Sequence, residues 1–451
     1  MRRGISRPSP DDIFFTLREV LIATLRAGQA RRACQRGGRI QGEAGSMSNL
    51  NRWQPRTTLR GEIYMSQQFD YVIVGGGAAA ATAVEGIRQH DERGSIAVFT
   101  REWAPPYQRP PLSKEFLQAR AGIESVLMQP ATWYIERNAA VHVGTEIAGI
   151  QPAEHAVVAG DGRIGYRKLL LATGAVPRRL AVAGADLEGV FTLRSYLDGE
   201  CLRAVRASAK RIVVVGSGFI GMEVAASLRS GGADVTVVTV DEQLYRQFGP
   251  DVSAFAKQLF DRHGVQTRFK TTLRSIDGEG RVGGVTLDDG TRLEADAVVI
   301  GIGVTPETSL ADAAGLRVEN GIVVDDRLRS SAPDVYAAGD VARFPSHRGA
   351  LTRVEHFDHA YSSGSAAGAN MAGADQPYRY LPFFWSDVFE LGFEFVGDVA
   401  ADARVSAGSI ESGSFVVEYR DGARLAGALL AMRSGEERDA YRERISSGSA
   451  G

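Results

Sequence analysis

Two glycine-rich turns, each preceded by an apolar run, constrain this sequence more than any other feature. Residues 212–224 read IVVVGSGFIGMEV, and residues 71–83 read YVIVGGGAAAATA. In such a turn the first glycine permits a tight bend, and the second lets backbone N–H groups approach a pyrophosphate. The third small residue lets the following helix pack closely on the strand. One such turn is weak evidence, but two of them, each between a predicted strand and helix, predict two dinucleotide-binding units.

Acidic residues at a suitable distance follow both turns. A carboxylate about 20 residues beyond such a turn is expected to bind a ribose. The next predicted strand delivers Arg101 and Glu102 after the first turn, and Asp241 and Glu242 after the second. Two nucleotide sites in one chain suggest one tightly held dinucleotide and one that diffuses. Because a nicotinamide gives its hydride to a flavin, we expect FAD together with NAD(P)H.

The remaining pattern predicts an α/β protein with two Rossmann-like dinucleotide-binding domains and a small mixed α+β C-terminal domain. The chain of 451 residues is long enough for two or three domains. Nearly all-apolar runs such as YVIV and IVVV are typical of strands buried on both faces of a parallel sheet. After Pro382 the strands alternate in polarity around Arg-Asp-Gly at 420–422, which indicates a hairpin.

The first 64 residues differ in charge from the rest of the chain. They hold 12 Arg, no Lys and 5 acidic residues, so 12 − 5 gives +7, and the remainder carries −2 − 7, or −9. An Arg-rich, acid-poor segment with an amphipathic patch at 13–25 is compatible with organelle targeting. We favour an unstructured extension, or a start upstream of the native one, because Met65 directly precedes SQQFDYVIVGGG. An arginine-rich tail that binds nucleic acid is a further alternative, but the arginines here are not interleaved with aromatic residues. We expect no nucleic-acid partner.

Composition excludes two classes of protein. No stretch approaches the roughly 18 to 20 uninterrupted apolar residues of a membrane helix, and we expect a cytoplasmic protein without a membrane span. The two cysteines, Cys34 and Cys201, are far apart. The sequence therefore holds no disulfide framework, no C-x-x-C pair for zinc or dithiol chemistry, and no predicted metal site.

Several further segments show a resemblance to a known group of enzymes. They are PPYQRPPLSKEF (105–116), LLATGAVPR (170–178), GIGVTPE (301–307) and DVYAAGDVA (334–342). These segments resemble the FAD- and NAD(P)-dependent pyridine nucleotide oxidoreductase superfamily. With RVEHFDHAYSSGSAAGANMAGADQPY (353–378) and FFWSD (383–387), they are similar to its branch of apoptosis-inducing-factor-like proteins and ferredoxin or rubredoxin reductases. The resemblance covers nearly everything from about residue 68 onward.

The resemblance implies roles for residues around the FAD. Its pyrophosphate would lie on Gly75, Gly77, Ala78 and Ala79, and Glu102 would bind the adenosine ribose. Arg109 and Lys114 would face the FAD phosphate and isoalloxazine, Asp340 would bind the ribityl chain, and His356 and Trp385 would line the flavin ring. The other expected cofactor contacts are Arg101, Ile147, Ala172, Thr173, Gly174, Arg194, Gly303, Glu355 and Phe357.

The resemblance also places the NADH. Its pyrophosphate would lie on the turn formed by Gly216, Gly218, Phe219, Ile220 and Gly221, with Phe219 beside the flavin. Glu223, expected in the first helical turn, resembles the acid near the nicotinamide and could pair with Lys114; a helix-start Glu that serves only the helix dipole is the alternative.

The second strand of this unit departs from many relatives. They end it with Glu, where this chain has Thr239, and Asp241 follows slightly later. An NADPH site would favour a cluster of basic residues that pairs with the 2′-phosphate. Arg246 is the only nearby candidate along the chain. We therefore expect NADH rather than NADPH.

These assignments predict a domain plan and a function. The leader is 1–65, the FAD domain is split over 66–190 and 308–376, the NADH domain is 191–307, and the C-terminal domain is 377–451. Hydride would pass from NADH C4 to flavin N5, with Lys114 and Glu223 as the catalytic pair. Without a dithiol, electrons would leave the flavin directly for an external acceptor such as a ferredoxin or rubredoxin. The alternative is a redox-sensing flavoprotein with slow turnover, and the resemblance also allows a homodimer.

Overall fold

The computed structural model describes residues 65–400 and 402–447. Met65 is the first residue of β1 (Met65–Val74), the central strand of the first sheet. The expectations for the Arg-rich leader therefore fall outside the described residues. No described helix is long and apolar enough to cross a membrane.

The first sheet surrounds the first glycine turn. Its strands follow the order β3-β2-β1-β6-β5-β4, and β18 pairs with β6. β1 runs parallel to β2 and β6, and its residues 71–74 are buried, as their apolar side chains predict. The other strands are β2 (Ile96–Phe99), β3 (Ala139–His142), β4 (Gly149–Gln151), β5 (Ala156–Ala159), β6 (Gly162–Leu171) and β18 (Val335–Ala337).

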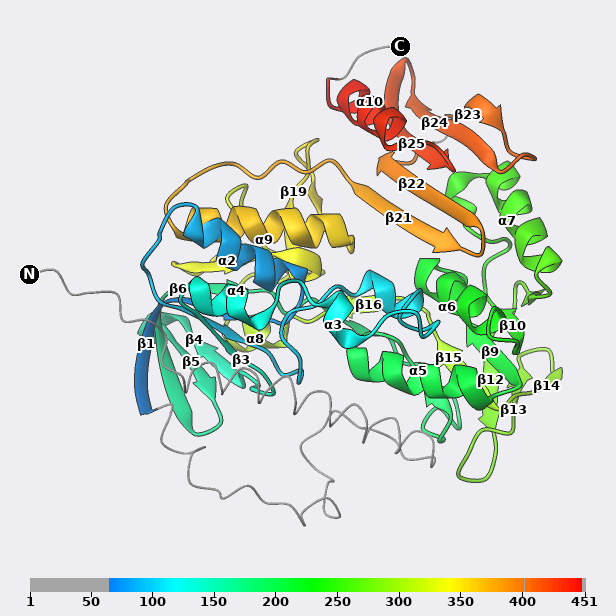
Figure 1. Cartoon of the computed structure of the whole chain (residues 1–451), viewed down its shortest axis with the longest axis horizontal. Helices are drawn as coiled ribbons and strands as arrows, with labels where there is room; N and C mark the ends of the chain where they lie inside the picture. The colour runs from blue at the N-terminus through cyan, green and yellow to red at the C-terminus, as the bar shows by residue number, and fades with distance from the viewer. Residues whose placement is uncertain (1–64, 401, 448–451) are drawn as a thin grey trace, which may run out of the picture.

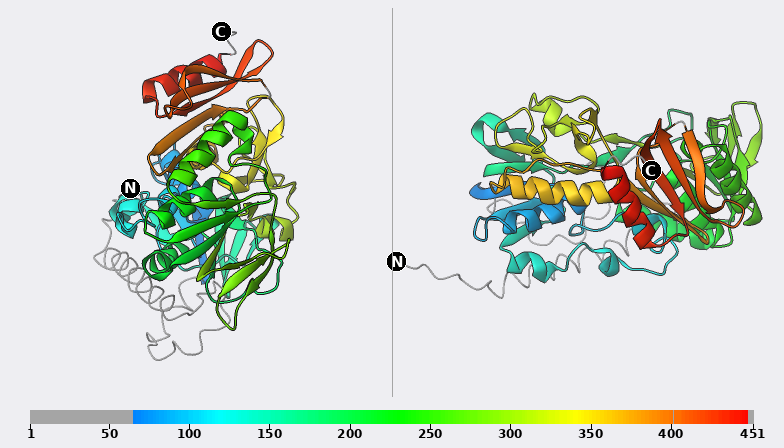
Figure 2. Two further views of the ribbon diagram at one scale, coloured as in Figure 1. Left: turned by 90° about the vertical axis from the view of Figure 1, so that its right-hand side faces the viewer. Right: turned by 90° about the horizontal axis from the view of Figure 1, so that it is seen from above.

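Two helices that are far apart in sequence pack closely beside this sheet. α2 (Ala78–Arg88) follows the glycine turn, and α9 (Phe357–Met371) lies alongside it (Figure 2). A Cβ at Gly364 would come within 2.3 Å of Ala79 O, and a Cβ at Gly368 within 2.2 Å of Ala83 O. Since these distances are far below van der Waals contact, only glycine permits this approach at both positions.

The second sheet surrounds the second glycine turn. Its strand order is β11-β10-β9-β15-β8, and all of its pairs are parallel. The strands are β8 (Val190–Phe191), β9 (Arg211–Val215), β10 (Asp234–Val238), β11 (Gln266–Arg268) and β15 (Ala297–Ile300). Its helices are α5 (Tyr196–Ser208), α6 (Phe219–Arg229) and α7 (Pro250–Arg262).

The C-terminal part is an antiparallel sheet with one helix, α10 (Gly435–Ser446). The strand order is β21-β22-β25-β24-β23. The strands are β21 (Phe383–Val388), β22 (Leu391–Gly397), β23 (Asp402–Ser409), β24 (Ser414–Asp421) and β25 (Arg424–Ala431). β24 and β25 form the hairpin that Arg-Asp-Gly predicts.

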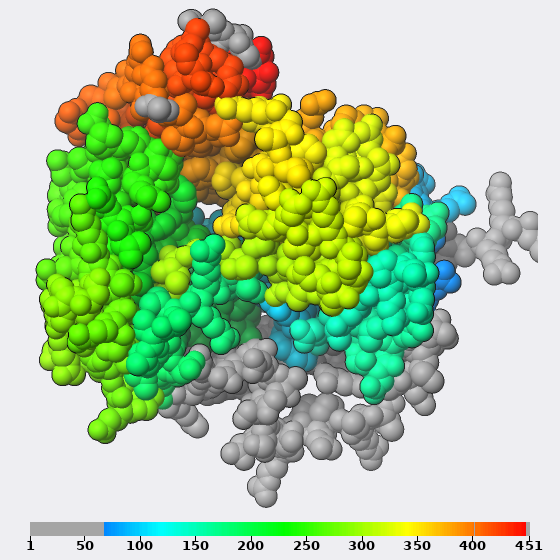
Figure 3. Space-filling model, turned by 180° about the vertical axis from the view of Figure 1, so that it is seen from behind, coloured from blue at the N-terminus to red at the C-terminus, as the bar shows by residue number. Residues whose placement is uncertain are grey.

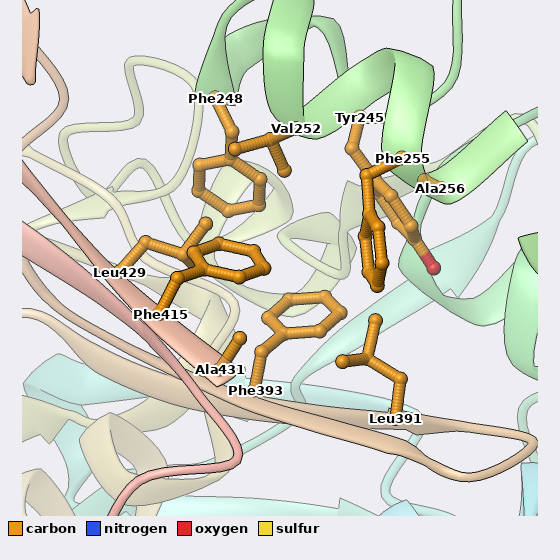
Figure 4. A pocket seen from close by; sticks show the side chains of 10 residues that line it. All are labelled: Tyr245, Phe248, Val252, Phe255, Ala256, Leu391, Phe393, Phe415, Leu429 and Ala431. Atoms are coloured by element: carbon orange, nitrogen blue, oxygen red, sulfur yellow. The ribbon is translucent and has the colours of Figure 1, made fainter. Parts of the chain in front are cut away.

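This sheet packs on the second unit through an apolar seam, shown in Figure 4. Tyr245, Phe248 and Phe255 from the turn before α7 and from α7 itself meet Phe393 and Phe415 of the sheet. The seam encloses a void of about 10 Å³ without polar lining. Such a space is too small and too apolar for a polar ligand, so the seam acts as a packed contact.

Shorter elements complete the described chain. The helical ones are η1 (Pro110–Ser113), α3 (Ile123–Val126), α4 (Ala131–Glu136), η2 (Pro152–Glu154), η3 (Arg246–Phe248), α8 (Ser309–Ala313) and η4 (Gly339–Val341). The strands are β7 (Ala175–Pro177), β12 (Leu273–Asp277), β13 (Gly284–Leu287), β14 (Arg292–Glu294), β16 (Val304–Pro306), β17 (Ile322–Val323), β19 (Ala342–Pro345) and β20 (Leu351–Thr352).

The predicted fold class is confirmed: two α/β units and a smaller C-terminal α+β unit. The second sheet is wholly parallel, and the first is parallel except at its β6-β5-β4 side, where the pairs are antiparallel. After β16 the chain returns to the first sheet, where β18 pairs with β6. The space-filling view shows a hollow between this returning segment, drawn in yellow, and the second unit, drawn in green, beneath the C-terminal sheet (Figure 3). The boundaries of the domain plan stay a prediction.

Candidate dinucleotide sites and active site

The first glycine turn has the geometry that a bound pyrophosphate requires. Gly75 has φ +149°, and a Cβ there would lie 2.2 Å from Ala172 O, so the position accepts only glycine. Gly77 caps the N-terminus of α2, and no atom of the described chain lies within 4 Å of where its Cβ would be. A tight turn followed by open space at a helix N-terminus fits a dinucleotide phosphate.

The second turn repeats this geometry. Gly216 has φ +106°, and its Cβ would lie 2.4 Å from Gly301 O, while that of Gly221 would lie 2.5 Å from Gly216 O. At the middle glycine, Gly218, nothing in residues 65–447 that the structure describes comes within 4 Å of an added Cβ. In both turns the first glycine, Gly75 or Gly216, is crowded, and the second, Gly77 or Gly218, is open. The third position is the crowded Gly221 in the second turn and Ala80 in the first.

Charged residues predicted to contact FAD form one connected network. Arg109 Nη2 donates to Glu102 Oε1 at 2.6 Å, and Arg109 Nη1 donates to the carbonyl of Arg194. Arg194 Nη2 in turn donates to Asp340 Oδ2 at 2.9 Å. Burial favours a raised pKa for Glu102, but the charge of Arg109 and the hydrogen bond from Tyr107 outweigh burial and hold that pKa below its usual value. Glu102 is therefore an anionic hydrogen-bond acceptor at neutral pH.

The expected pairing of Lys114 with Glu223 is confirmed. Lys114 Nζ lies 2.9 Å from Glu223 Oε1, and both side chains are largely buried, with exposed fractions of 11% and 3%. Ser113 Oγ and Ser386 Oγ donate to the two carboxylate oxygens of Glu223. Because η1, α6 and β21 supply these groups, the ion pair joins three parts of the chain.

The expected position of Glu223 in the first turn of α6 is wrong. The helix begins at Phe219, and its first turn holds no acidic residue. Glu223 is the fifth residue of the helix and is neutralised by Lys114, so a role confined to the helix dipole does not explain it.

An aromatic group is built partly from the same elements as this ion pair, α6 and β21. The Phe219 ring of α6 is 4.7 Å from that of Phe384 in β21, and the His356 ring is 4.9 Å from that of Phe384. Phe357 and Trp385 meet edge to face at 5.8 Å. Burial lowers the pKa of His356 to about 4, so the ring is neutral at pH 7. Its buried Nδ1 has no hydrogen-bond partner within the described chain, which is what a ligand-facing atom would show.

Asp241 lies at a polar corner beyond β10. It accepts a hydrogen bond from Ser217 Oγ at 2.9 Å and forms an ion pair with Arg246 at 3.2 Å. The structure also brings Lys270 here, since its backbone N–H donates to Asp241 O and its Nζ lies 2.7 Å from Glu242. Proximity along the chain alone had pointed only to Arg246.

The other predicted positions lie around these groups. Ile147 and Ala172 are buried in the first core, and the exposed Arg101 is 3.9 Å from Glu307. Thr173 Oγ1 donates to Glu307 O, and Glu355 pairs with Arg353 at 2.8 Å. A Cβ at Gly174 would lie 3.0 Å from Arg194 Nη2. Ile220 is 48% exposed at the start of α6, and Gly303 has φ +94° beyond β15.

Four residues of these sites were missed from the sequence: Ser113, Ser217, Ser386 and Lys270. Ser113, Ser217 and Ser386 stand inside quoted motifs, and their neighbours could have drawn attention to them. Lys270 reaches its site only through tertiary packing, and no local signal identifies it.

Comparison with known proteins gives the family. Residues 69–364 match the family described as pyridine nucleotide-disulphide oxidoreductase. The chain belongs to this oxidoreductase family. It is 37% identical over 358 residues to the 5,5′-dehydrodivanillate O-demethylase ferredoxin reductase subunit of Sphingobium sp. (strain NBRC 103272 / SYK-6), covering 78% of this chain and 87% of that one. It is 38% identical over 361 residues to rhodocoxin reductase of Rhodococcus erythropolis, covering 79% and 84%.

A solved structure agrees with this placement of the oxidoreductase. The covalent putidaredoxin reductase–putidaredoxin complex contains a chain with 32% identity and a TM-score of 0.80, covering 86% of this chain and 94% of that one. The two cysteines of the oxidoreductase, Cys34 and Cys201, are 201 − 34, or 167, positions apart along the chain. In the part of the chain that the structure describes, no group of three or more His, Cys, Asp or Glu could hold a metal ion.

Proposed function

We propose that the chain is an FAD-dependent NADH oxidoreductase that passes electrons to an external carrier of the ferredoxin or rubredoxin type. The observation that carries this proposal is the pair of glycine turns in two separate sheets, each with an open second glycine at the start of a helix and each following a strand with parallel neighbours. FAD, when bound, accepts two electrons from NADH and releases them one at a time.

The residues around the first turn suit FAD. Gly75, Gly77, Ala78 and Ala79 would hold the pyrophosphate, and the anionic Glu102 would accept hydrogen bonds from the ribose. Asp340, fixed by Arg194, would accept hydrogen bonds from the ribityl hydroxyls. The neutral His356, with its unpartnered Nδ1, and Trp385 would line the ring.

The residues around the second turn suit NADH. Gly216, Gly218 and Gly221 would hold its pyrophosphate, and Asp241 would accept hydrogen bonds from its adenosine ribose. Phe219, at the start of α6, would lie beside the flavin.

The Lys114–Glu223 pair would set the charge between the two rings. A lysine ammonium near the flavin stabilises negative charge that develops there, and Glu223 fixes the ammonium in place through the 2.9 Å contact. Ser113 and Ser386 occupy the carboxylate oxygens, so the carboxylate cannot rotate freely.

The acceptor follows from the relatives. Several are named as ferredoxin or rubredoxin reductases, among them rubredoxin–NAD(+) reductase of Pseudomonas putida at 36% identity. These names favour a reductase over the redox-sensing alternative of the apoptosis-inducing-factor-like branch. We place the enzyme in the cytoplasm, where NADH and small electron carriers meet.

The test is purification followed by turnover. The protein should be yellow, release intact FAD on heating, and oxidise NADH rapidly when ferricyanide or a ferredoxin is added. A folded, colourless protein that cannot be reconstituted with FAD would contradict the proposal. Slow turnover with a stable charge-transfer band would instead support the sensing alternative.

A further inference from the structure

The corner beyond β10 holds two ion pairs side by side. Asp241 pairs with Arg246 at 3.2 Å, and Glu242 pairs with Lys270 at 2.7 Å. Arg246 and Lys270 are 71% and 64% exposed. Both of these exposed cations are therefore already paired with a carboxylate.

Two buried hydroxyl groups hold Asp241 in position through hydrogen bonds. Ser217, the residue between the first two glycines of the second turn, donates to Asp241 Oδ2 at 2.9 Å. Thr239 Oγ1 lies 2.9 Å from Ser217 Oγ and accepts a hydrogen bond from the Asp241 backbone N–H at 3.1 Å. Ser217 and Thr239 are only 5% and 3% exposed, so this contact is sheltered from competing water.

Arg246 stands on an anchored turn. Tyr245, which precedes Arg246, and Phe248, two residues beyond it, are buried in the apolar seam (Figure 4). The side chain of Arg246 is 71% exposed. Tyr245 also stacks on Phe219 at 5.5 Å. Because the turn is fixed, the guanidinium stays within reach of Asp241.

We propose that Ser217 and Thr239 are positioning residues for coenzyme choice, and that Asp241 withholds Arg246 from a 2′-phosphate. The inference rests on the proposed binding of NADH at the second turn. A braced carboxylate accepts hydrogen bonds from a ribose 2′-hydroxyl and repels a 2′-phosphate. Removal of that carboxylate would release a fixed guanidinium, which binds phosphate well.

The first experiment measures the equilibrium binding of NAD⁺ and NADP⁺ by calorimetry. Asp241→Ser should weaken NAD⁺ about tenfold, as expected for one lost charge-assisted hydrogen bond, and tighten NADP⁺ about fivefold. In the double variant Asp241→Ser/Arg246→Gln, most of the NADP⁺ gain should disappear. A double variant that binds NADP⁺ as tightly as Asp241→Ser would overturn the withholding of Arg246, because the gain would then come from lost repulsion alone.

The second experiment uses Ser217→Ala and Thr239→Val to test whether these two hydroxyl groups position Asp241. Each should raise the KM for NADH about threefold to tenfold and leave kcat within about twofold, since only ribose binding is disturbed. The control is Ser253→Ala on α7, which removes a buried hydroxyl that donates to Gly249 O at 2.8 Å rather than to Asp241. An unchanged KM in Ser217→Ala, or an equal rise in the control, would overturn the positioning role.

The wild type separates this inference from the function on which it rests. A wild type that binds neither NAD⁺ nor NADP⁺ would contradict the proposed function. If the wild type binds NAD⁺ and the variants Ser217→Ala and Thr239→Val have the same KM for NADH as the wild type, only the inference about this corner is contradicted.

Discussion

At the residue scale, the buried Lys114–Glu223 pair is the feature with the strongest consequences. Two opposite charges 2.9 Å apart with little exposure interact strongly, and loss of one partner leaves the other charge buried and uncompensated. The two hydroxyl donors on Glu223 do not replace the lysine, because neither carries a charge.

We predict that Lys114→Ala and Glu223→Ala each slow the reduction of bound FAD by NADH in stopped flow, while FAD stays bound. The two residues act as one unit, so the double variant should be little slower than the slower single variant. If the fold reductions in rate of the two single variants multiply in the double variant, the two residues do not act together, and our description of this site is contradicted.

A surface pair supplies the control for that cycle. Lys257 and Asp261 on α7 are 2.5 Å apart but 37% and 48% exposed. An exposed pair at this spacing contributes about 0.3–0.5 kcal/mol. Alanine variants of this pair should be close to additive and leave the reduction rate unchanged.

The sequence predicted this pair only through its motifs, because nothing local joins positions 114 and 223. The glycines could be predicted from physical reasoning, since each turn needs a residue without Cβ. The contact of Ser386 with Glu223 could not be predicted, although Ser386 lies in the motif FFWSD, because it spans 163 residues and depends on the packing of β21 on α6.

At the element scale, α2 and α9 depend on glycine for their close approach. The glycine turn before α2 and the strand that precedes it were predictable from apolar runs and spacing. The contact with α9 was not predictable, because the pattern of a helix does not name its partner.

We predict that Gly368→Ala lowers the melting temperature and reduces the free energy of unfolding by about 2–4 kcal/mol. A Cβ there would lie 2.2 Å from Ala83 O, a backbone atom that cannot move aside without separating the helices. Thermal and urea unfolding measure the change. The control is Gly122→Ala, where φ is −104° and the described neighbours leave more than 4 Å around the new Cβ, so stability should change by less than about 0.5 kcal/mol.

At the scale of the whole molecule, the first strand begins at Met65, within the boundary predicted for the leader. We predict that a chain starting at Met65 keeps its FAD, its melting temperature and its NADH activity. Loss of FAD on this truncation would show that residues 1–64 contribute to the fold and that the predicted domain boundary is wrong.

The whole molecule also carries buried histidines that couple its stability to pH. Burial lowers the pKa of His142 and His356 to about 4 and that of His359 to about 3. An unfolded histidine has a pKa of about 6.5. Between about pH 6.5 and pH 4 the unfolded chain therefore binds protons that the folded chain does not, and the free energy of unfolding falls as the pH falls.

We predict that His142→Phe makes this pH dependence shallower. Phenylalanine can keep the stacking on Phe99, where the ring centroids are 4.6 Å apart, but it binds no proton in either state. The slope of unfolding free energy against pH should decrease by up to about 1.4 kcal/mol per pH unit between pH 6 and pH 4.5. Urea unfolding at several pH values measures both slopes, and because carboxylates are common to the two proteins, their contribution cancels in the difference. Parallel curves would mean that His142 takes up its proton equally in both states, and the low pKa assigned to it from burial would be wrong.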